Sequence, residues 1–220
     1  MFRENGTREY EGSFLQGLKD GEGKLFDAGG NPVFEGSFTS DEIIYGELLS
    51  KTPEAIRKMY FGSQSMYTES EDLGNDSVIH LKDINALYLA ESDGSATDDS
   101  LKAVSVSVLS DVFRSGRMEA RGIEAVKQIL GEPVYEGYSS VILPEAVAIN
   151  ILNDRQNTLR GRVNMDTTTV YSDDTMVNSI DPDYTVYIYT FRKGDLLYSF
   201  VCSEPGGGFA FYEIQADNDN

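Results

Sequence analysis

The sequence shows its clearest pattern at Tyr10-Glu11-Gly12-Ser13-Phe14, and the pattern returns 24 residues later at Phe34-Glu35-Gly36-Ser37-Phe38. Gly6 precedes the first copy at the same distance at which Gly30 precedes the second. An internal repeat of this length is typical of a supersecondary unit that stacks on its neighbours. The repeat therefore decides the predicted fold of the first part of the chain.

Within the first copy, every second residue is aromatic or glycine. In an extended strand Tyr10, Gly12 and Phe14 share one face, and polar residues share the other. A returning strand would carry Gly21 and Gly23 on one face. A glycine opposite an aromatic ring leaves a bare stretch of backbone that the ring can cover. We therefore expect these residues to be structural partners and not a catalytic set.

Turn-forming residues separate the predicted strands. Gly17 and the segment 18–20 predict the tight connection of the first hairpin, and the segment 28–32 (Ala-Gly-Gly-Asn-Pro) predicts the next turn. This arrangement, from Tyr10 through Gly17 to Gly21-Glu22-Gly23, resembles the MORN (membrane occupation and recognition nexus) repeat.

The resemblance covers about the first quarter of the chain. MORN repeats serve mostly as scaffolds and contact surfaces, so the resemblance implies a structural or contact role for nine residues. These are Tyr10, Gly12, Phe14, Gly17, Gly21, Gly23, Phe34, Gly36 and Phe38.

The second copy loses the glycine pattern after its aromatic strand. Asp41, Tyr45 and Glu47 stand where the first copy has its later glycines, which predicts a final, atypical strand over 43–49. A stack of such units needs about three of them to bury a core. We therefore expect the hairpins to pack against the following domain, against a second chain, or against repeats missing upstream of Met1.

The fold class predicted for the whole chain is α+β. Residues 1–50 form the MORN-type β-hairpin segment, and residues 51–220 form an α+β domain with helices packed on an antiparallel sheet. Cap, proline and glycine signals predict helices over 52–62, 119–130 and 144–153. Apolar runs and turn signals predict strands over 84–90, 103–109, 184–191, 196–202 and 209–214.

The charge of the chain limits its partners. The formal net charge is −19, from 37 acids against 18 bases. Nine of the acids lie in residues 66–100, where Lys82 is the only lysine or arginine. Such a field repels phosphate backbones and anionic lipid head groups. We therefore expect no nucleic-acid partner, and direct binding to anionic membranes is disfavoured.

The compartment of the protein stays open. There is no apolar run of about 18 residues and no charged-then-apolar start, so the sequence predicts neither a membrane span nor a signal peptide. If the protein is exported or lipid-anchored, its leader has been removed. The acidic composition with one cysteine favours a bacterial protein. A buried structural thiol is expected for Cys202.

No residue pattern predicts catalysis, a metal site or a cofactor. His80 is the only histidine, which excludes a histidine-rich zinc site, and we expect it at the surface or at a cap. Segment 93–99 lacks EF-hand spacing and is expected to be a solvated hairpin tip rather than a calcium loop, and the acids at 173–174 and 181–183 are interpreted in the same way.

Two arginine sets stand out against the acidic background, and we expect them to neutralise acids rather than to form an anion pocket. They comprise Arg114, Arg117 and Arg121, then Arg155, Arg160 and Arg162.

The sequence leaves three functions open. The first is a non-enzymatic binding or scaffold module that contacts a protein partner or a second copy. The second is a carboxylate-based hydrolase, and the third is an envelope-associated, lipid-anchored module. A cleft lined by two carboxylates about 5 to 9 Å apart would favour the hydrolase. An aromatic patch at an exposed sheet edge would favour the binding module.

Overall fold

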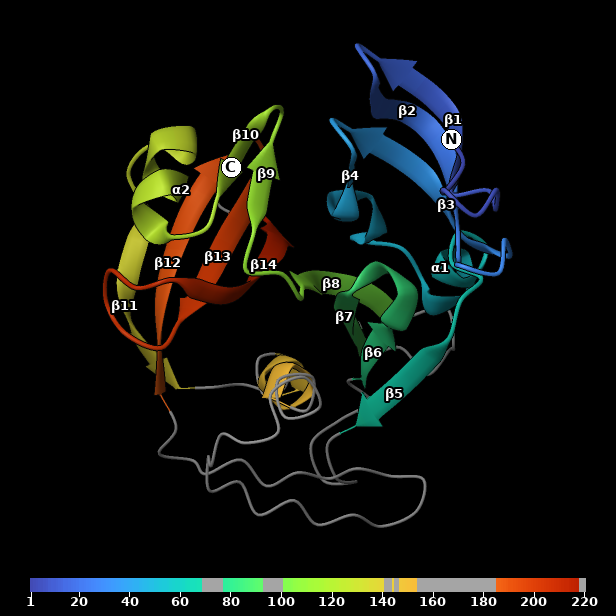
Figure 1. The fold of residues 1–220 in the computed structure, drawn as a ribbon. Coiled ribbons are helices and arrows are strands. Elements are labelled where there is room, and N and C mark those ends of the chain that lie inside the picture. The colour runs from blue at the N-terminus through green and yellow to red at the C-terminus, as the bar shows by residue number, and fades with distance from the viewer. Residues whose placement is uncertain (69–76, 93–100, 141–143, 145–146, 154–184, 218–220) are drawn as a thin grey trace.

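The fold of the protein, taken from a computed structural model, consists mostly of antiparallel β-sheet with few helices (Figure 1). The structure describes residues 1–68, 77–92, 101–140, 144, 147–153 and 185–217. A four-stranded sheet and an eight-stranded sheet make up most of the fold, with a short separate hairpin between them. The expected α+β class therefore holds only coarsely, because strands dominate and helices are short.

The four-stranded sheet holds the sequence repeat. Its strands run in chain order: β1 (Tyr10–Leu15), β2 (Leu18–Phe26), β3 (Pro32–Thr39) and β4 (Glu42–Ile43). The predicted antiparallel hairpins are present. The segment 18–20, expected in the first turn, is instead the start of β2. Gln16 and Gly17 alone make the turn, both with positive φ (52° and 86°), as a two-residue hairpin loop requires.

The eight-stranded sheet brings together strands from both halves of the chain. Its order is β11-β12-β13-β14-β8-β7-β6-β5, and every neighbouring pair is antiparallel. The predicted hairpin of β7 with β8 and the predicted meander of β12, β13 and β14 are confirmed. The strands are β5 (Gln64–Thr68), β6 (Ser77–Leu81), β7 (Ala86–Ser92), β8 (Leu101–Val108), β11 (Tyr135–Ser140), β12 (Thr185–Lys193), β13 (Leu196–Cys202) and β14 (Phe209–Ala216).

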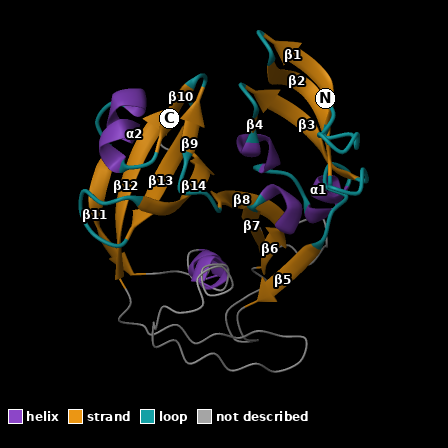
Figure 2. Ribbon diagram, viewed as in Figure 1, coloured by secondary structure: helices purple, strands orange, loops and turns teal. Residues whose placement is uncertain are grey.

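The short hairpin and the helices lie against these sheets (Figure 2). β9 (Phe113–Ser115) pairs with β10 (Met118–Ala120), and α2 (Ile123–Leu130) follows directly. The second predicted helix therefore starts four residues later than expected, because its first residues are used in β10. Residues 147–153 are helical, which agrees with the described part of the third predicted helix.

The first predicted helix is shorter than expected. α1 (Pro53–Arg57) begins at a Thr52 cap, whose hydroxyl accepts a hydrogen bond from the Ala55 amide at 3.2 Å. The helix does not reach residue 62, because residues 59–61 run beside β3. The Met59 carbonyl accepts from the Glu35 amide at 2.7 Å, and the Phe61 amide donates to the Val33 carbonyl at 2.9 Å. Pairing with β3 therefore overrides the local helical signal.

The predicted strand over 43–49 is wrong. After the two residues of β4, the chain turns into the 3₁₀ helix η1 (Tyr45–Leu48). A 3₁₀ turn places residues three apart on one side, so Tyr45 and Leu48 both point into the core, where they are buried. The Tyr45 hydroxyl donates to the Ile84 carbonyl at 2.8 Å. Burial of this pair explains why the segment does not extend the sheet.

Two other predicted boundaries are wrong by a few residues. Ile84 belongs to the 3₁₀ helix η2 (Lys82–Ile84) rather than to β7, and the left-handed Asn85 (φ 52°) separates them. The turn between β12 and β13 comprises residues 194–195 alone, because the first two residues of the expected turn, 192–193, still pair with β13.

The eight-stranded sheet has a core on each face. The larger core contains Phe191, Phe200 and Tyr212, together with Ile123 and Val126 of α2. The smaller core, on the other face, contains Phe211 and Val201 with side chains from the helix over 147–153. Within the described part of the chain, no helix is both long and apolar enough to span a membrane.

Candidate functional site

The repeat's aromatic residues form a continuous row on one face of the four-stranded sheet. Phe14, Tyr10, Phe38 and Phe34 follow one another edge to face, with successive ring centroids 5.2, 5.0 and 5.9 Å apart. Tyr10, Phe34 and Phe38 are buried, whereas Phe14 at the end of the row is 47% exposed. Most of the row therefore belongs to the core, and only its Phe14 end is exposed to solvent.

Three of the predicted glycines, Gly12, Gly23 and Gly36, lie under these rings. Gly12 pairs with Gly23, and Gly23 pairs with Gly36, so a glycine row crosses three strands. The direct partner of each is a glycine. The rings over Gly12 and Gly36 come from residues two positions earlier, and the ring over Gly23 is that of Tyr10 on the neighbouring strand. A Cβ added to Gly12 would lie 2.5 Å from the Tyr10 hydroxyl oxygen, and one added to Gly36 would lie 2.7 Å from Phe34 Cζ. Gly21, in contrast, does pair with an aromatic residue, Phe38.

Tyr60 joins the repeat to the rest of the chain. It forms an isolated bridge with Phe34, and both belong to the larger core. Its hydroxyl donates to Asp83 Oδ2 at 2.6 Å and accepts from the Asp83 amide at 3.1 Å. Burial raises the pKa of Tyr60 well above its usual range. The hairpins thus share one core with residues beyond position 50.

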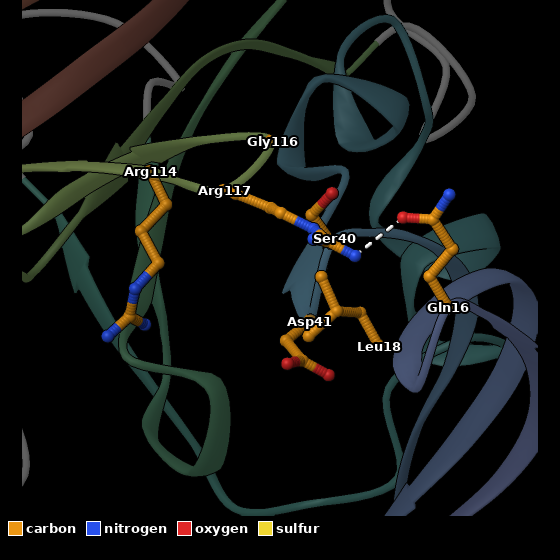
Figure 3. A pocket seen from close by; sticks show the side chains of 7 residues that line it. All are labelled: Gln16, Leu18, Ser40, Asp41, Arg114, Gly116 and Arg117. Carbon is orange, nitrogen blue, oxygen red and sulfur yellow. Dashed lines mark hydrogen bonds between the residues drawn. The ribbon is translucent and has the colours of Figure 1, made fainter.

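A hollow of about 510 Å³ lies where hairpin tips meet (Figure 3). Arg117, in the turn between β9 and β10, donates to the Gln16 side chain at 2.5 Å and so joins that turn to the one between β1 and β2. Asp41 lines the hollow from the turn after β3, and its carboxylate accepts from the Lys19 amide at 2.8 Å. The remaining lining residues are Leu18, Ser40, Arg114 and Gly116.

The first arginine set, Arg114, Arg117 and Arg121, behaves largely as expected, and its first two members line the hollow. Arg114 forms ion pairs with Glu42 at 2.7 Å and with Glu119 at 2.9 Å, and Arg121 also pairs with Glu119 at 2.9 Å. The hydrogen bond from Arg114 lowers the pKa of the Glu119 carboxyl. Two of the three arginines are therefore neutralised by acids. Asp41 is the one carboxylate in the lining, so the hollow lacks the carboxylate pair that a glycosidase needs.

A row of mainly polar residues, called the polar row below, crosses the eight-stranded sheet on the face of the smaller core. Its cross-strand neighbours are Thr190, Ser199, Glu213, Ser107, Leu87 and His80. His80 is buried on β6, so the expectation of a surface or capping histidine is wrong. Three strand spacings separate it from Glu213, roughly 14 Å. A direct hydrogen bond between them is therefore impossible, and the row contains no Ser-His-Glu arrangement.

Cys202 is a buried structural thiol, as expected. Burial raises its pKa to about 12, so it is not a thiolate at neutral pH. It belongs to the larger core, whereas His80 lies on the other face of the sheet. Among the described residues, no three histidine, cysteine, aspartate or glutamate side chains gather as they would around a metal ion.

Glu213 gives a prediction for stability. Burial raises the pKa of its carboxyl, although Ser105 and Gln215 nearby oppose the shift. A raised folded-state pKa means that stability is greatest below the ordinary glutamate pKa, about 4.3, and is lost as pH rises through the folded-state value. Glu213→Gln cannot ionise, so we expect its melting temperature to exceed that of the natural protein at pH 8. The difference should shrink steadily towards pH 4.5.

The exposed Glu204→Gln is the matched control for this comparison, and thermal melts across the pH range are the measurement. A Glu213→Gln variant that melts below the natural protein at pH 8 would show that the carboxylate is stabilised in the fold.

Among the aromatic side chains that the structure describes in the eight-stranded sheet, those of strand β11 are the most exposed. Tyr135 is 51% exposed and Tyr138 is 63% exposed, and Val134 beside them is exposed as well. Tyr138 packs edge to face on Tyr187 of β12, with ring centroids 4.9 Å apart. β11 is the outermost strand and has a partner on one side only among the described strands (Figure 1). With respect to the described residues, it is therefore an aromatic sheet edge with no strand on its outer side.

The sequence of this edge repeats that of β3. Pro133-Val134-Tyr135-Glu136-Gly137 is identical to Pro32-Val33-Phe34-Glu35-Gly36 at four of the five positions. At the remaining position Tyr135 replaces Phe34, one aromatic residue for another. The local geometry matches too, since a Cβ on Gly137 would lie 2.8 Å from the Tyr135 hydroxyl oxygen. Sequence reasoning missed this site because the spacing of 101 residues is not a multiple of the 24-residue repeat.

Several expectations lie outside the described residues. These are the acidic segment 93–99, the acids at 173–174 and 181–183, and the arginines Arg155, Arg160 and Arg162. Neither a protein-family model, nor a curated protein, nor a solved structure matches this chain.

Proposed function

We propose that this protein is a non-enzymatic binding module that takes up an extended segment of a partner protein along β11. The observation that supports the proposal most directly is the exposure of Tyr135 and Tyr138 on an outermost strand. An open edge offers unpaired backbone N–H and C=O groups on alternate residues. A partner strand can satisfy these groups, and the two tyrosines supply apolar contact on both faces.

The edge lacks the features that usually prevent pairing. Tyr135–Ser140 contains no proline and no lysine, and Glu136 is its single charged residue. The four-stranded sheet differs, because the start of β1 is partly covered. The terminal amine of Met1 donates a hydrogen bond to the Tyr10 carbonyl at 2.6 Å, and Phe2 forms an isolated β-bridge with Arg8. β11 is thus the better candidate for strand addition.

In this proposal the first fifty residues act as a MORN-type scaffold. Three of the four residues in their aromatic row are buried in one core with Tyr60, which is consistent with a supporting role. The net charge of −19 favours a neutral or basic protein segment as partner and disfavours nucleic acid and anionic membranes. Neither the polar hollow nor the polar row brings acid, base and nucleophile together, so the binding function is favoured over a hydrolase.

The test uses synthetic β-prone peptides with a central glycine, in basic, neutral and acidic versions, titrated into isotope-labelled protein. We expect amide shifts confined to β11 and β12, with the basic peptide binding most tightly at low salt. Tyr138→Lys should weaken binding at least about tenfold, because a charged side chain at an edge discourages pairing.

Met66→Lys is the matched control. Met66 is 68% exposed on β5, the strand at the opposite edge of the same sheet, so the variant adds the same charge at a distance. It should bind the peptides as the natural protein does. Shifts centred on Gln16 and Arg117, or no binding of any peptide to the monomeric protein, would overturn the proposal.

A further inference from the structure

We propose that the segment that pairs with β11 is β11 of a second copy, in an antiparallel arrangement with Gly137 on the two-fold axis. This inference rests on the proposed function, because it names the partner of the same edge. The two eight-stranded sheets would then form one continuous sheet across the axis.

Symmetry restricts the register of such a pair. Two identical antiparallel strands in one sheet are related by a two-fold axis perpendicular to the sheet, so each side chain stays on its own face. A residue can then oppose only itself or a residue an even number of positions away. The possible centres near the middle of β11 are Glu136, Gly137 and Tyr138.

The chemistry of the strand favours Gly137 as the centre. A pair centred on Glu136 would place two carboxylates directly opposite each other, which is destabilising. A pair centred on Tyr138 would place Gly137 opposite Ser139, so no two glycines would meet beneath the Tyr135 ring. A pair centred on Gly137 places Glu136 opposite Tyr138 of the second copy, whose hydroxyl can donate to the carboxylate. It also places Tyr135 opposite Ser139 of the second copy, which leaves room for the tyrosine ring over the two glycines.

The protein already contains this register. In the four-stranded sheet Gly23 pairs with a glycine on each side, Gly12 and Gly36, and the Tyr10 ring spans the first of these pairs. A Cβ on either Gly12 or Gly23 would meet the Tyr10 hydroxyl oxygen, so one ring covers two opposed glycines. Tyr135 lies over Gly137 in the same way, ready to cover the glycine of a second copy.

Among the described strands, β11 lacks the second pairing partner that the equivalent segment of β3 has. The Pro-Val-aromatic-Glu-Gly segment of β3 is paired on both sides: Phe34 faces Leu25 of β2, and Glu35 and Val33 bond to residues 59–61. The equivalent segment of β11 pairs with β12 alone among the described strands. A second β11 would supply the missing side.

Charge gives the association a distinctive salt dependence. Each copy carries a net charge of −19, so two copies repel at long range, although Glu136 is the only charge within the strand. Salt screens this repulsion. Self-association should therefore strengthen as salt is raised, whereas binding of a basic peptide at the same edge should weaken.

The decisive experiment introduces single cysteines into the full chain and oxidises them. Cα atoms of opposed residues in an antiparallel pair are about 4.5–5.5 Å apart, within the range that a disulfide can bridge. Gly137→Cys should cross-link two copies at least about tenfold faster than Glu136→Cys or Ser139→Cys. The natural Cys202 is buried and does not compete.

Gly137→Cys requires the Tyr135 hydroxyl to move, so sedimentation of the protein without substitution provides an independent measurement. We expect a monomer–dimer equilibrium that Tyr138→Lys shifts to monomer and Met66→Lys leaves unchanged. Faster cross-linking of Met66→Cys, or a protein that stays monomeric at high concentration and high salt, would overturn self-pairing. Strand addition would survive that result if the basic peptide still bound at β11, and both proposals would fall if it did not.

Discussion

Gly12→Val is expected to lower the melting temperature by about 6–12 °C. The new Cβ would lie 2.5 Å from the Gly23 Cα and 2.5 Å from the Glu22 carbonyl oxygen, which are backbone atoms of the neighbouring strand. Backbone cannot move aside as the end of a side chain can, so the strands must separate. Forced overpacking of this kind costs about 3 kcal/mol, and each kcal/mol shifts the melting temperature by about 2–4 °C in a chain of this size.

Glu11→Lys is the matched control on the neighbouring residue. Glu11 is exposed and pairs with Arg8 at 2.6 Å, an exposed ion pair that contributes less than about 1 kcal/mol. Its loss should barely change the melting temperature. Equal losses from Gly12→Val and Glu11→Lys would contradict the strand register that places the glycine row beneath the rings.

Tyr60→Ala is expected to destabilise the protein by about 3–5 kcal/mol, the range for removing a large buried aromatic side chain. Tyr60 is 2% exposed and lies between the repeat and the rest of the core. Tyr60→Phe keeps the ring and removes the hydroxyl bonded to Asp83 and to the Ser63 carbonyl, so it should cost only about 1–2 kcal/mol.

Thermal or denaturant unfolding measures both losses, and hydrogen exchange locates them. With Tyr60→Ala, protection should fall first in β1, β2 and β3, because their contact with residues 59–61 is weakened. Unchanged protection in these strands, together with a small loss of stability, would mean that the repeat is held by contacts other than those of Tyr60.

The two proposals on β11 do not depend on these stability results. β11 lies at the far edge of the other sheet, and its exposed tyrosines contribute little to either core. Variants of Tyr138 should therefore change association and leave the melting temperature of the monomer nearly unchanged. This separation allows binding and folding to be measured on the same set of proteins.

Local sequence signals predicted the elements whose determinants lie close together in the chain. The strand at Tyr10–Phe14, the Thr52 cap with Pro53, and the meander of β12, β13 and β14 are confirmed. In each case a turn, a cap or a period of two fixes the backbone within a few residues. The burial of Cys202 followed from its apolar strand in the same way.

Tertiary contacts decided the rest. The first helix stops at Arg57 because residues 59–61 pair with β3, and η1 replaces a strand because Tyr45 and Leu48 must share one buried side. The order of the eight strands, which places β14 beside β8, depends on pairing between distant segments, and local patterns carry no information on it. The likeness of Tyr135-Glu136-Gly137 to a repeat strand is written in the sequence, but its spacing of 101 residues hid it, and only the assembled sheet places this strand at the outer edge of the described strands, because that place depends on pairing between distant segments.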